Sequence, residues 1–201
     1  IEAPEDIMLL TECQDASDVI RVKTSATKDK PRRTLVITSS CGLCGREEIE
    51  ALIASLARIE SDRLIAAAQI GDVAAKVRAL QPLFNATGGA HSSALVQTDG
   101  TVRCVREDVG RHNALDKLIG HALIQGLPMD KMAVFLSGRT SIEMIIKVAR
   151  ARIPILMAVG APTDAAVTAA DQLGITLCGF LRDNTMSVYA HGERISTAAG
   201  R

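Results

Sequence analysis

The last third of the chain alternates short apolar runs with segments of helical length, and this alternation constrains the fold more than any other feature. The apolar runs at 132–136, 153–159 and 175–180 have the length of buried strands. The segments 141–151 and about 164–173, which separate these runs, are predicted helices. Strands joined by helices run parallel in one sheet, with the helices packed against its faces. The sequence therefore predicts an α/β fold.

Weaker patterns predict the elements that precede this unit. Asp99 and Gly100 form the dipeptide most typical of a two-residue hairpin, and apolar residues flank the pair on both sides. Apolar residues at helical spacing indicate amphipathic helices at 46–59 and about 111–125. The remaining predictions are a helix at 72–83, strands at 34–39, 94–98 and 102–105, and a strand at 186–190 that turns back beside the third strand of the last unit.

Charge and composition exclude several function classes. The chain has 23 Lys+Arg and 23 Asp+Glu, so it lacks the net basic charge typical of nucleic-acid binding. One Tyr, three Phe and no Trp are too few to build a base-stacking platform. No segment approaches the roughly 20 apolar residues that a membrane-spanning helix requires. We therefore expect neither a nucleic-acid partner nor a membrane partner.

The chain contains five cysteines at irregular spacing. An odd number of cysteines in a chain of this length does not indicate a disulfide scaffold. No basic-then-apolar signal segment opens the sequence, so we expect a reducing, cytoplasmic compartment. The five are Cys13, Cys41, Cys44, Cys104 and Cys178.

The close pair of cysteines lies in the segment SSCGLCG, between a predicted strand end and a predicted helix start. At a helix start the positive end of the helix dipole lowers the pKa of a thiol, which favours thiolate at Cys41 and Cys44. Gly42 and Gly45 keep the loop tight and accessible. Two sulfurs at this spacing can bind a metal, cycle as a disulfide or carry a sulfur atom. The spacing alone does not choose among these, although a four-thiolate zinc site is disfavoured because the other cysteines stand alone.

Two further segments combine glycine or helix-start chemistry with basic residues. In NATGGAH, Gly88 and Gly89 can present backbone N–H groups to an anion, although the same glycines would also end the preceding helix. In REDVGRHN, Asp108 is placed to cap a helix. Arg111 and His112 then fall in its first turn, where cations are unfavourable. A bound anion or acidic partner would explain them, and a salt-bridged surface is the alternative.

Two strand ends also have the residues of a phosphate-binding crevice. LSGRTS joins a strand to a helix, and Thr140 with Glu143 predicts a capping box. Such crevices bind phosphate-bearing ligands in open α/β sheets, although the Gly-Lys-Ser/Thr ending of the Walker motif is absent. FLRDNT at 180–185 follows the third strand. It suits a nucleotide, with a simple hairpin turn as the alternative.

Five segments, in order and spacing, resemble the FdhD family, the sulfurtransferases accessory to formate dehydrogenase. The resemblance covers about residues 1–195. Family members carry an additional N-terminal stretch, so we expect residues 1–40 to be a partial N-terminal region and residues 41–201 to form the sulfurtransferase domain. The segments are SSCGLCG, FNATGGAH, REDVGRHNALDK, LSGRTSIEM and GFLRDNTMSVYA.

The resemblance implies a cytidine-deaminase-like three-layer α/β sandwich, with a mixed, largely parallel sheet flanked by helices. It also implies a homodimer that acts in the cytoplasm. A cysteine desulfurase would deliver sulfur to the CxxC loop as a persulfide, with Cys41 as the persulfide cysteine and Cys44 assisting or relaying. The sulfur would pass to the bis-molybdopterin guanine dinucleotide form of the molybdenum cofactor, which formate dehydrogenase requires.

The cofactor-binding segment of the family falls on one stretch of this chain, where Arg182 is the natural phosphate contact and a guanine nucleotide such as GDP can occupy the site. From the residues themselves we add Arg111, His112 and Arg139 as hypothesised contacts. As an alternative, Asp108 or Asp116 accepts hydrogen bonds from the N–H groups of a guanine. The stretch comprises Phe180, Leu181, Arg182, Asp183, Asn184 and Thr185.

Other function classes are separable by their signatures. A zinc deaminase requires His-x-Glu and Pro-Cys-x-x-Cys, but Ser92 and Ser93 follow His91, and Ser40 precedes Cys41. We therefore expect no metal site. A thioredoxin-like oxidoreductase would leave the C-terminal α/β unit without a purpose. The remaining alternative is a non-catalytic, cofactor-binding chaperone for apo-formate dehydrogenase, in which the cysteines serve structure.

Overall fold

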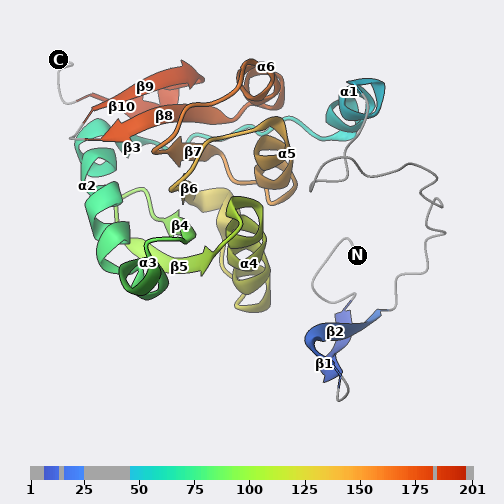
Figure 1. Ribbon diagram of the computed structural model, residues 1–201. Coiled ribbons are helices and arrows are strands. Elements are labelled where there is room, and N and C mark those ends of the chain that lie inside the picture. The colour runs from blue at the N-terminus through green and yellow to red at the C-terminus, as the bar shows by residue number, and fades with distance from the viewer. Residues whose placement is uncertain (1–6, 14–15, 25–45, 183–184, 198–201) are drawn as a thin grey trace. The chain divides into compact units, whose positions relative to one another are not determined.

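The computed structural model describes residues 7–13, 16–24, 46–182 and 185–197, and it divides the chain into two compact units, 1–36 and 37–201. In the first unit, β1 (Ile7–Cys13) and β2 (Ala16–Thr24) pair antiparallel (Figure 1). The strand predicted at 34–39 lies outside the described residues. No helix in the described ranges is long and apolar enough to cross a membrane.

The second unit is built around a six-stranded mixed sheet with the order β5-β4-β6-β7-β8-β9. β6, β7 and β8 are parallel, β4 runs antiparallel to both β5 and β6, and β9 runs antiparallel to β8. The parallel centre, the Asp99–Gly100 hairpin between β4 and β5, and the returning last strand are all confirmed. The strands are β4 (His91–Val96), β5 (Val102–Asp108), β6 (Ala133–Leu136), β7 (Ile155–Ala158), β8 (Thr176–Arg182) and β9 (Thr185–Ala190).

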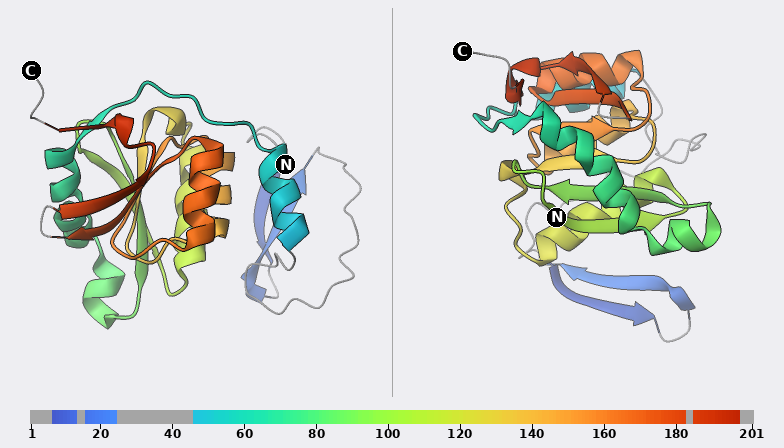
Figure 2. Two further views of the ribbon diagram at one scale, coloured as in Figure 1. Left: turned by 90° about the horizontal axis from the view of Figure 1, so that it is seen from above. Right: turned by 90° about the vertical axis from the view of Figure 1, so that its left-hand side faces the viewer.

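Helices cover both faces of this sheet, so the unit has three layers (Figure 2). α4, α5 and α6 pack on one face and α2 on the other. The mixed α/β sheet flanked by helices is therefore confirmed, and the cytidine-deaminase-like arrangement stays a prediction. The helices are α1 (Arg46–Ser55), α2 (Ala67–Ala79), α3 (Pro82–Thr87), α4 (Arg111–Ile124), α5 (Ile142–Arg150) and α6 (Asp164–Leu173).

The single helix predicted at 72–83 is wrong, because this stretch belongs to two helices, α2 and α3. Pro82 has no backbone N–H and its ring clashes with the preceding turn, so it cannot continue α2. It fits the first position of α3, where the missing N–H costs nothing. Gly88, at φ +67°, then ends α3, as the glycine pair predicted. The chain therefore turns twice before β4.

The central strands are buried on both faces, which explains why they are continuously apolar in sequence. On one side Leu95, Leu156 and Leu177 pack with residues of α4, α5 and α6. On the other side Phe135 and Met157 pack with residues of α2. The two hydrophobic layers share no side chain, so the sheet separates two cores.

A buried arginine ties the segment after α1 to the rest of this unit. Arg194 is 6% exposed and donates hydrogen bonds to the backbone oxygens of Ser61 (3.0 Å), Gly174 (2.8 Å) and Ile59 (3.4 Å), and to Thr176 Oγ1 (3.2 Å). Burial lowers the pKa of the guanidinium, yet the array of carbonyl acceptors supports it. The side chain therefore donates the hydrogen bonds that water would otherwise donate to these three carbonyl groups.

We predict that Arg194→Met lowers the free energy of unfolding by about 2–4 kcal/mol, because buried carbonyl groups lose their donor. Urea denaturation measures this loss. Arg150→Met, at the exposed end of α5, is the matched control and should change stability by less than about 0.5 kcal/mol. Equal losses in the two variants would show that the Arg194 hydrogen bonds do not stabilise the fold.

Candidate anion-binding site

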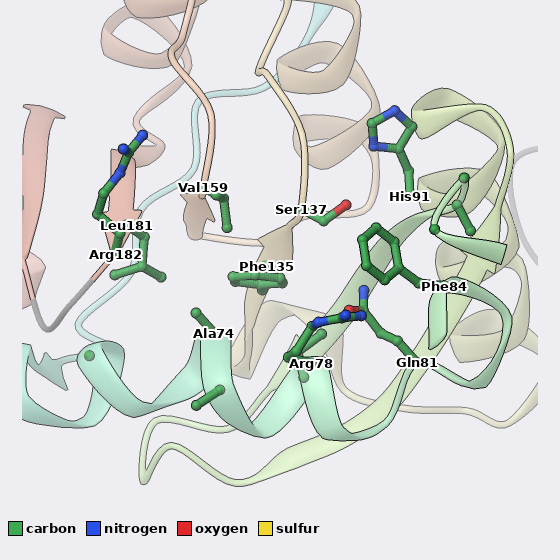
Figure 3. Close-up of a pocket in the computed structure, with 16 residues that line it drawn as sticks. Ala74, Arg78, Gln81, Phe84, His91, Phe135, Ser137, Val159, Leu181 and Arg182 are labelled. Atoms are coloured by element: carbon green, nitrogen blue, oxygen red, sulfur yellow. The ribbon is translucent and has the colours of Figure 1, made fainter. Parts of the chain in front are cut away.

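A cavity of about 760 Å³ opens between α2 and the sheet, at the carboxyl ends of the parallel strands (Figure 3). Ser137 follows β6, Val159 follows β7, and Leu181 and Arg182 end β8. Phe135 lies between these strand ends and α2. Ligands of open α/β sheets bind at this edge, where strand ends leave a crevice.

The cavity brings together three of the five sequence segments that carry the family resemblance. Phe84 and His91 come from FNATGGAH, Ser137 from LSGRTSIEM, and Leu181 and Arg182 from GFLRDNTMSVYA. These segments are far apart in sequence and meet because β4 begins at the edge where β6 and β8 end. The structure therefore assembles one concave surface from segments that are far apart in the sequence.

The charged side chains of this cavity are basic. Arg78, on α2, and Arg182 line it together with His91, whereas no Asp or Glu belongs to its lining. Neither arginine side chain forms a hydrogen bond or ion pair with another described residue. In Figure 3, Arg182 lies toward one end and His91 and Phe84 toward the other, with Arg78 on the α2 side. Guanidinium groups without acidic partners suit an anionic ligand, with phosphate the best geometric match.

Close backbone contacts hold the three strand ends in place. Gly160 N donates to Gly138 O (3.2 Å), and Phe180 N donates to Gly160 O (3.3 Å). A Cβ atom on Gly160 would lie 2.7 Å from Arg139 N, which leaves no room for a side chain. The loops after β6 and β7 and the end of β8 are therefore stacked backbone against backbone.

The predicted segment 180–185 borders the cavity in part. Phe180 has φ +52° and is 41% exposed, and β8 is irregular in register at this point. Leu181 is buried in the cavity wall and Arg182 lines it, as the hypothesised phosphate contact would require. Thr185 Oγ1 donates to Arg182 O (2.8 Å), which stabilises the turn into β9. Asp183 and Asn184 lie outside the described residues, as do Cys41 and Cys44.

The three other hypothesised contacts are not part of the cavity wall. Arg111 and His91, a lining residue, both lie close to Gly138. A Cβ atom on Gly138 would be 3.6 Å from Arg111 Cδ and 3.3 Å from His91 Nδ1, so Arg111 lies next to the cavity. Burial, followed by the charges of Arg111 and Lys147, lowers the pKa of His112. Arg139 belongs to the loop after β6 and is absent from the lining. Their roles in binding stay predictions.

The two carboxylates proposed as guanine readers have partners of their own. Asp108 Oδ1 accepts from Gly110 N (2.9 Å), and Asp108 Oδ2 pairs with Lys117 Nζ (2.5 Å). The Lys117 and Gly110 contacts lower the pKa of Asp108 to about 2. Asp108 thus supports the start of α4, although the N-cap residue is Gly110. Asp116 Oδ2 pairs with Lys147 Nζ on α5 (2.5 Å).

The predicted capping box of Thr140 and Glu143 is wrong. α5 begins at Ile142, so its N-cap residue is Ser141, which makes no side-chain cap hydrogen bond. Thr140 instead forms a parallel bridge with Pro162, and its N–H donates to Ala161 O (3.1 Å). Tertiary pairing with the loop after β7 therefore keeps Thr140 in the extended backbone.

Sequence reasoning missed two residues that shape the cavity. Arg78 lies in a helix with no motif around it, and only the packing of α2 over the sheet brings it to the site. Glu107 belongs to REDVGRHN, but its carboxylate accepts from Leu83 N (2.9 Å) and Phe84 N (2.8 Å) at the start of α3. The glycine pair after Phe84 was the one sequence signal near this wall. Among the described residues no group of three His, Cys, Asp or Glu side chains is close enough to hold a metal ion.

Comparison with known proteins identifies relatives over the whole chain. The model of the FdhD/NarQ family matches residues 1–196. "Sulfur carrier protein FdhD" from Mycolicibacterium paratuberculosis is 38% identical, covering 97% of this chain and 77% of that protein. The protein of the same name from Streptomyces coelicolor is 40% identical, covering 90% of this chain and 67% of that protein.

A solved structure is similar as well. The crystal structure of a protein assigned as a formate dehydrogenase accessory protein, from Desulfotalea psychrophila, matches with a TM-score of 0.79 and 27% identity. The match covers 98% of this chain and 74% of that chain. The similarity therefore extends over nearly all of this chain in three dimensions.

We predict that Gly160→Ala lowers the free energy of unfolding by about 1–3 kcal/mol, because its Cβ would force the loops after β6 and β7 apart. Gly120→Ala, within α4, is the matched control: no atom lies within 4 Å of its added Cβ, and it should stabilise the helix by about 0.5–1 kcal/mol. Urea denaturation of both variants tests the difference. A Gly160→Ala protein as stable as the wild type would show that the loops are not constrained by this contact.

Proposed function

This chain belongs to the FdhD/NarQ family, and we propose that it is a sulfur carrier that serves formate dehydrogenase. The names of the relatives support the sulfur-carrying role, and the similar crystal structure supports the client. The single structural observation behind the proposal is the cavity at the strand ends, with unpaired guanidinium groups and no carboxylate in its lining. Such a site suits a substrate rich in phosphate.

Cys41 and Cys44 carry the sulfur in this proposal. The Cys41 thiolate attacks the outer sulfur of a persulfide on a cysteine desulfurase. The S–S bond of the donor breaks, the donor leaves as a thiolate, and a persulfide forms on Cys41. The exchange needs no external oxidant or reductant because one persulfide replaces another. Cys44 assists or relays the sulfur by the same exchange.

Cys104 and Cys178 are poor competitors for this sulfur. Burial raises the pKa of Cys104, which is half-buried in β5, and raises the pKa of Cys178 to about 12. At neutral pH both are therefore thiols, and the thiol is a weak nucleophile. The sulfur-carrying step is assigned to the CxxC pair on chemical grounds.

The substrate of the transfer is the bis-molybdopterin guanine dinucleotide form of the molybdenum cofactor. When bound, it supplies the metal centre that receives the sulfur. In this proposal the chain's own residues bind and orient it through the 180–185 segment, of which Leu181 and Arg182 line the cavity. Arg182 is the proposed phosphate contact. Arg111, His112 and Arg139 extend the basic surface beside the Gly138 loop in this proposal. The guanidinium groups in the cavity lining support this proposal because they match the charge of pyrophosphate.

We extend the proposal to the assembly and location that the family resemblance implies. We expect a cytidine-deaminase-like homodimer in the cytoplasm, with a cysteine desulfurase as donor and formate dehydrogenase as client. A cofactor-binding chaperone would use the same cavity, so the cavity does not separate the two functions. Sulfur transfer by Cys41 separates them, because only the sulfur carrier requires it.

We predict that incubation with a cysteine desulfurase and L-cysteine adds the mass of one sulfur atom to Cys41, and that reduction removes it. Intact and peptide mass spectrometry measure the addition. Cys104→Ser and Cys178→Ser should still accept sulfur, because burial keeps these thiols protonated.

Cys41→Ala should accept no stable sulfur and should fail to support an active formate dehydrogenase. An active dehydrogenase with Cys41→Ala would instead support the chaperone. Sulfur found on Cys104 or Cys178 in the wild type would contradict the assignment of the carrier cysteine.

A further inference from the structure

An arginine–phenylalanine pair forms the α2–α3 side of the cavity. The Arg78 guanidinium carbon lies 3.9 Å from the centroid of the Phe84 ring. This cation–π contact holds the Arg78 guanidinium against the ring. No described residue accepts a hydrogen bond from the guanidinium N–H groups. The side chain is therefore oriented by the ring, while its donors stay available in the cavity (Figure 3).

The ring is itself held by the sheet. α3 is short, and its first N–H groups would otherwise lack partners. The Glu107 carboxylate, on β5, accepts from both Leu83 N and Phe84 N. Gln81, buried at the N-cap of α3, hydrogen-bonds with Ser92 Oγ on β4. Two strands thus fix the short helix that carries Phe84.

Small residues form the neighbouring part of the cavity wall. Gly71, Ala74 and Ala75 are the α2 residues beside Arg78 in the lining, and their side chains are minimal. Phe135 and Leu181 also line the cavity, and Ala74 packs against the hydrophobic cluster that contains them. Apolar lining residues next to a guanidinium group match a ligand that joins a planar ring to a phosphate. A nucleotide has that chemistry.

We propose that Arg78 is a phosphate contact for the guanine nucleotide part of the substrate, and that Phe84 and Glu107 are positioning residues that act through it. The proposal rests on the function proposed above. Arg78 would be a second arginine contact beside Arg182, on α2 instead of β8. The Phe84 ring orients its side chain before the ligand binds. Preorganisation matters because a free arginine loses rotamer entropy when it binds.

Titration calorimetry with GDP, pyrophosphate and guanosine tests the phosphate contact. Arg78→Gln should weaken GDP and pyrophosphate binding by on the order of tenfold or more and leave guanosine binding within about twofold. Arg78→Lys keeps the charge but loses the planar fork, so it should lie between wild type and Arg78→Gln. Arg150→Gln, on the exposed end of α5, is the control and should bind GDP like the wild type.

Double variants test the positioning roles. Phe84→Leu should weaken GDP binding by roughly threefold to fivefold, because the guanidinium loses its ring. Glu107→Gln should weaken it by roughly twofold to fivefold, because its amide would direct an N–H group at a backbone donor. In an Arg78→Gln background neither change should weaken binding further. Urea denaturation of each variant shows whether it is folded.

The outcomes separate this inference from the proposed function. A wild-type protein that binds neither GDP nor pyrophosphate would overturn the nucleotide site itself. Wild-type binding that Arg78→Gln leaves unchanged would overturn the role of Arg78 alone. An additive loss from Phe84→Leu in the Arg78→Gln background would show that the ring touches the ligand directly, which contradicts a positioning role.

Discussion

Three short parallel strands, buried on both faces, are the constraint on which the rest of this structure depends. β6, β7 and β8 present apolar side chains to two separate cores, so helices must exclude water from each side. Parallel pairing also obliges the chain to cross back over the sheet between strands. As a result the carboxyl ends of all three strands lie at one edge, and the loops that leave them are neighbours.

Polar side chains lie at this edge because helices cover both faces of the rest of the sheet. The backbone of Gly138, Gly160 and Phe180 is in direct contact, which sets the distance between the strand ends. β4 begins at the same edge with His91, and α2 adds Arg78 from the opposite layer. The lining of this cavity contains arginines and no carboxylate, so the cavity suits an anionic ligand. The family membership gives that anion an identity to test.

Much of the architecture was predictable from local patterns. α6 was predicted at about 164–173 and occupies Asp164–Leu173, because helical length and its flanking residues are local signals. Local patterns were misleading where tertiary contacts competed with them. Thr140 has the residue type of a helix cap, but its backbone pairs with Pro162 in the loop after β7. The place of Arg182 at the cavity was predictable because the segment 180–185 comes at the end of a predicted strand. Arg78 was not, because nothing within its own helix marks it.

The sequence by itself determined the alternation of strands and helices in the last third of the chain, the parallel centre of the sheet, and the family. Those properties reside in apolar periodicity, turn residues and motifs, which are read over a few neighbouring positions. Only the tertiary structure decided that Arg78, His91 and Arg182 line one cavity, and that Glu107 of one motif supports the helix carrying Phe84 of another. Such contacts join residues that are distant in sequence. They form because the parallel strands of one sheet, covered by helices on both faces, have their carboxyl ends side by side.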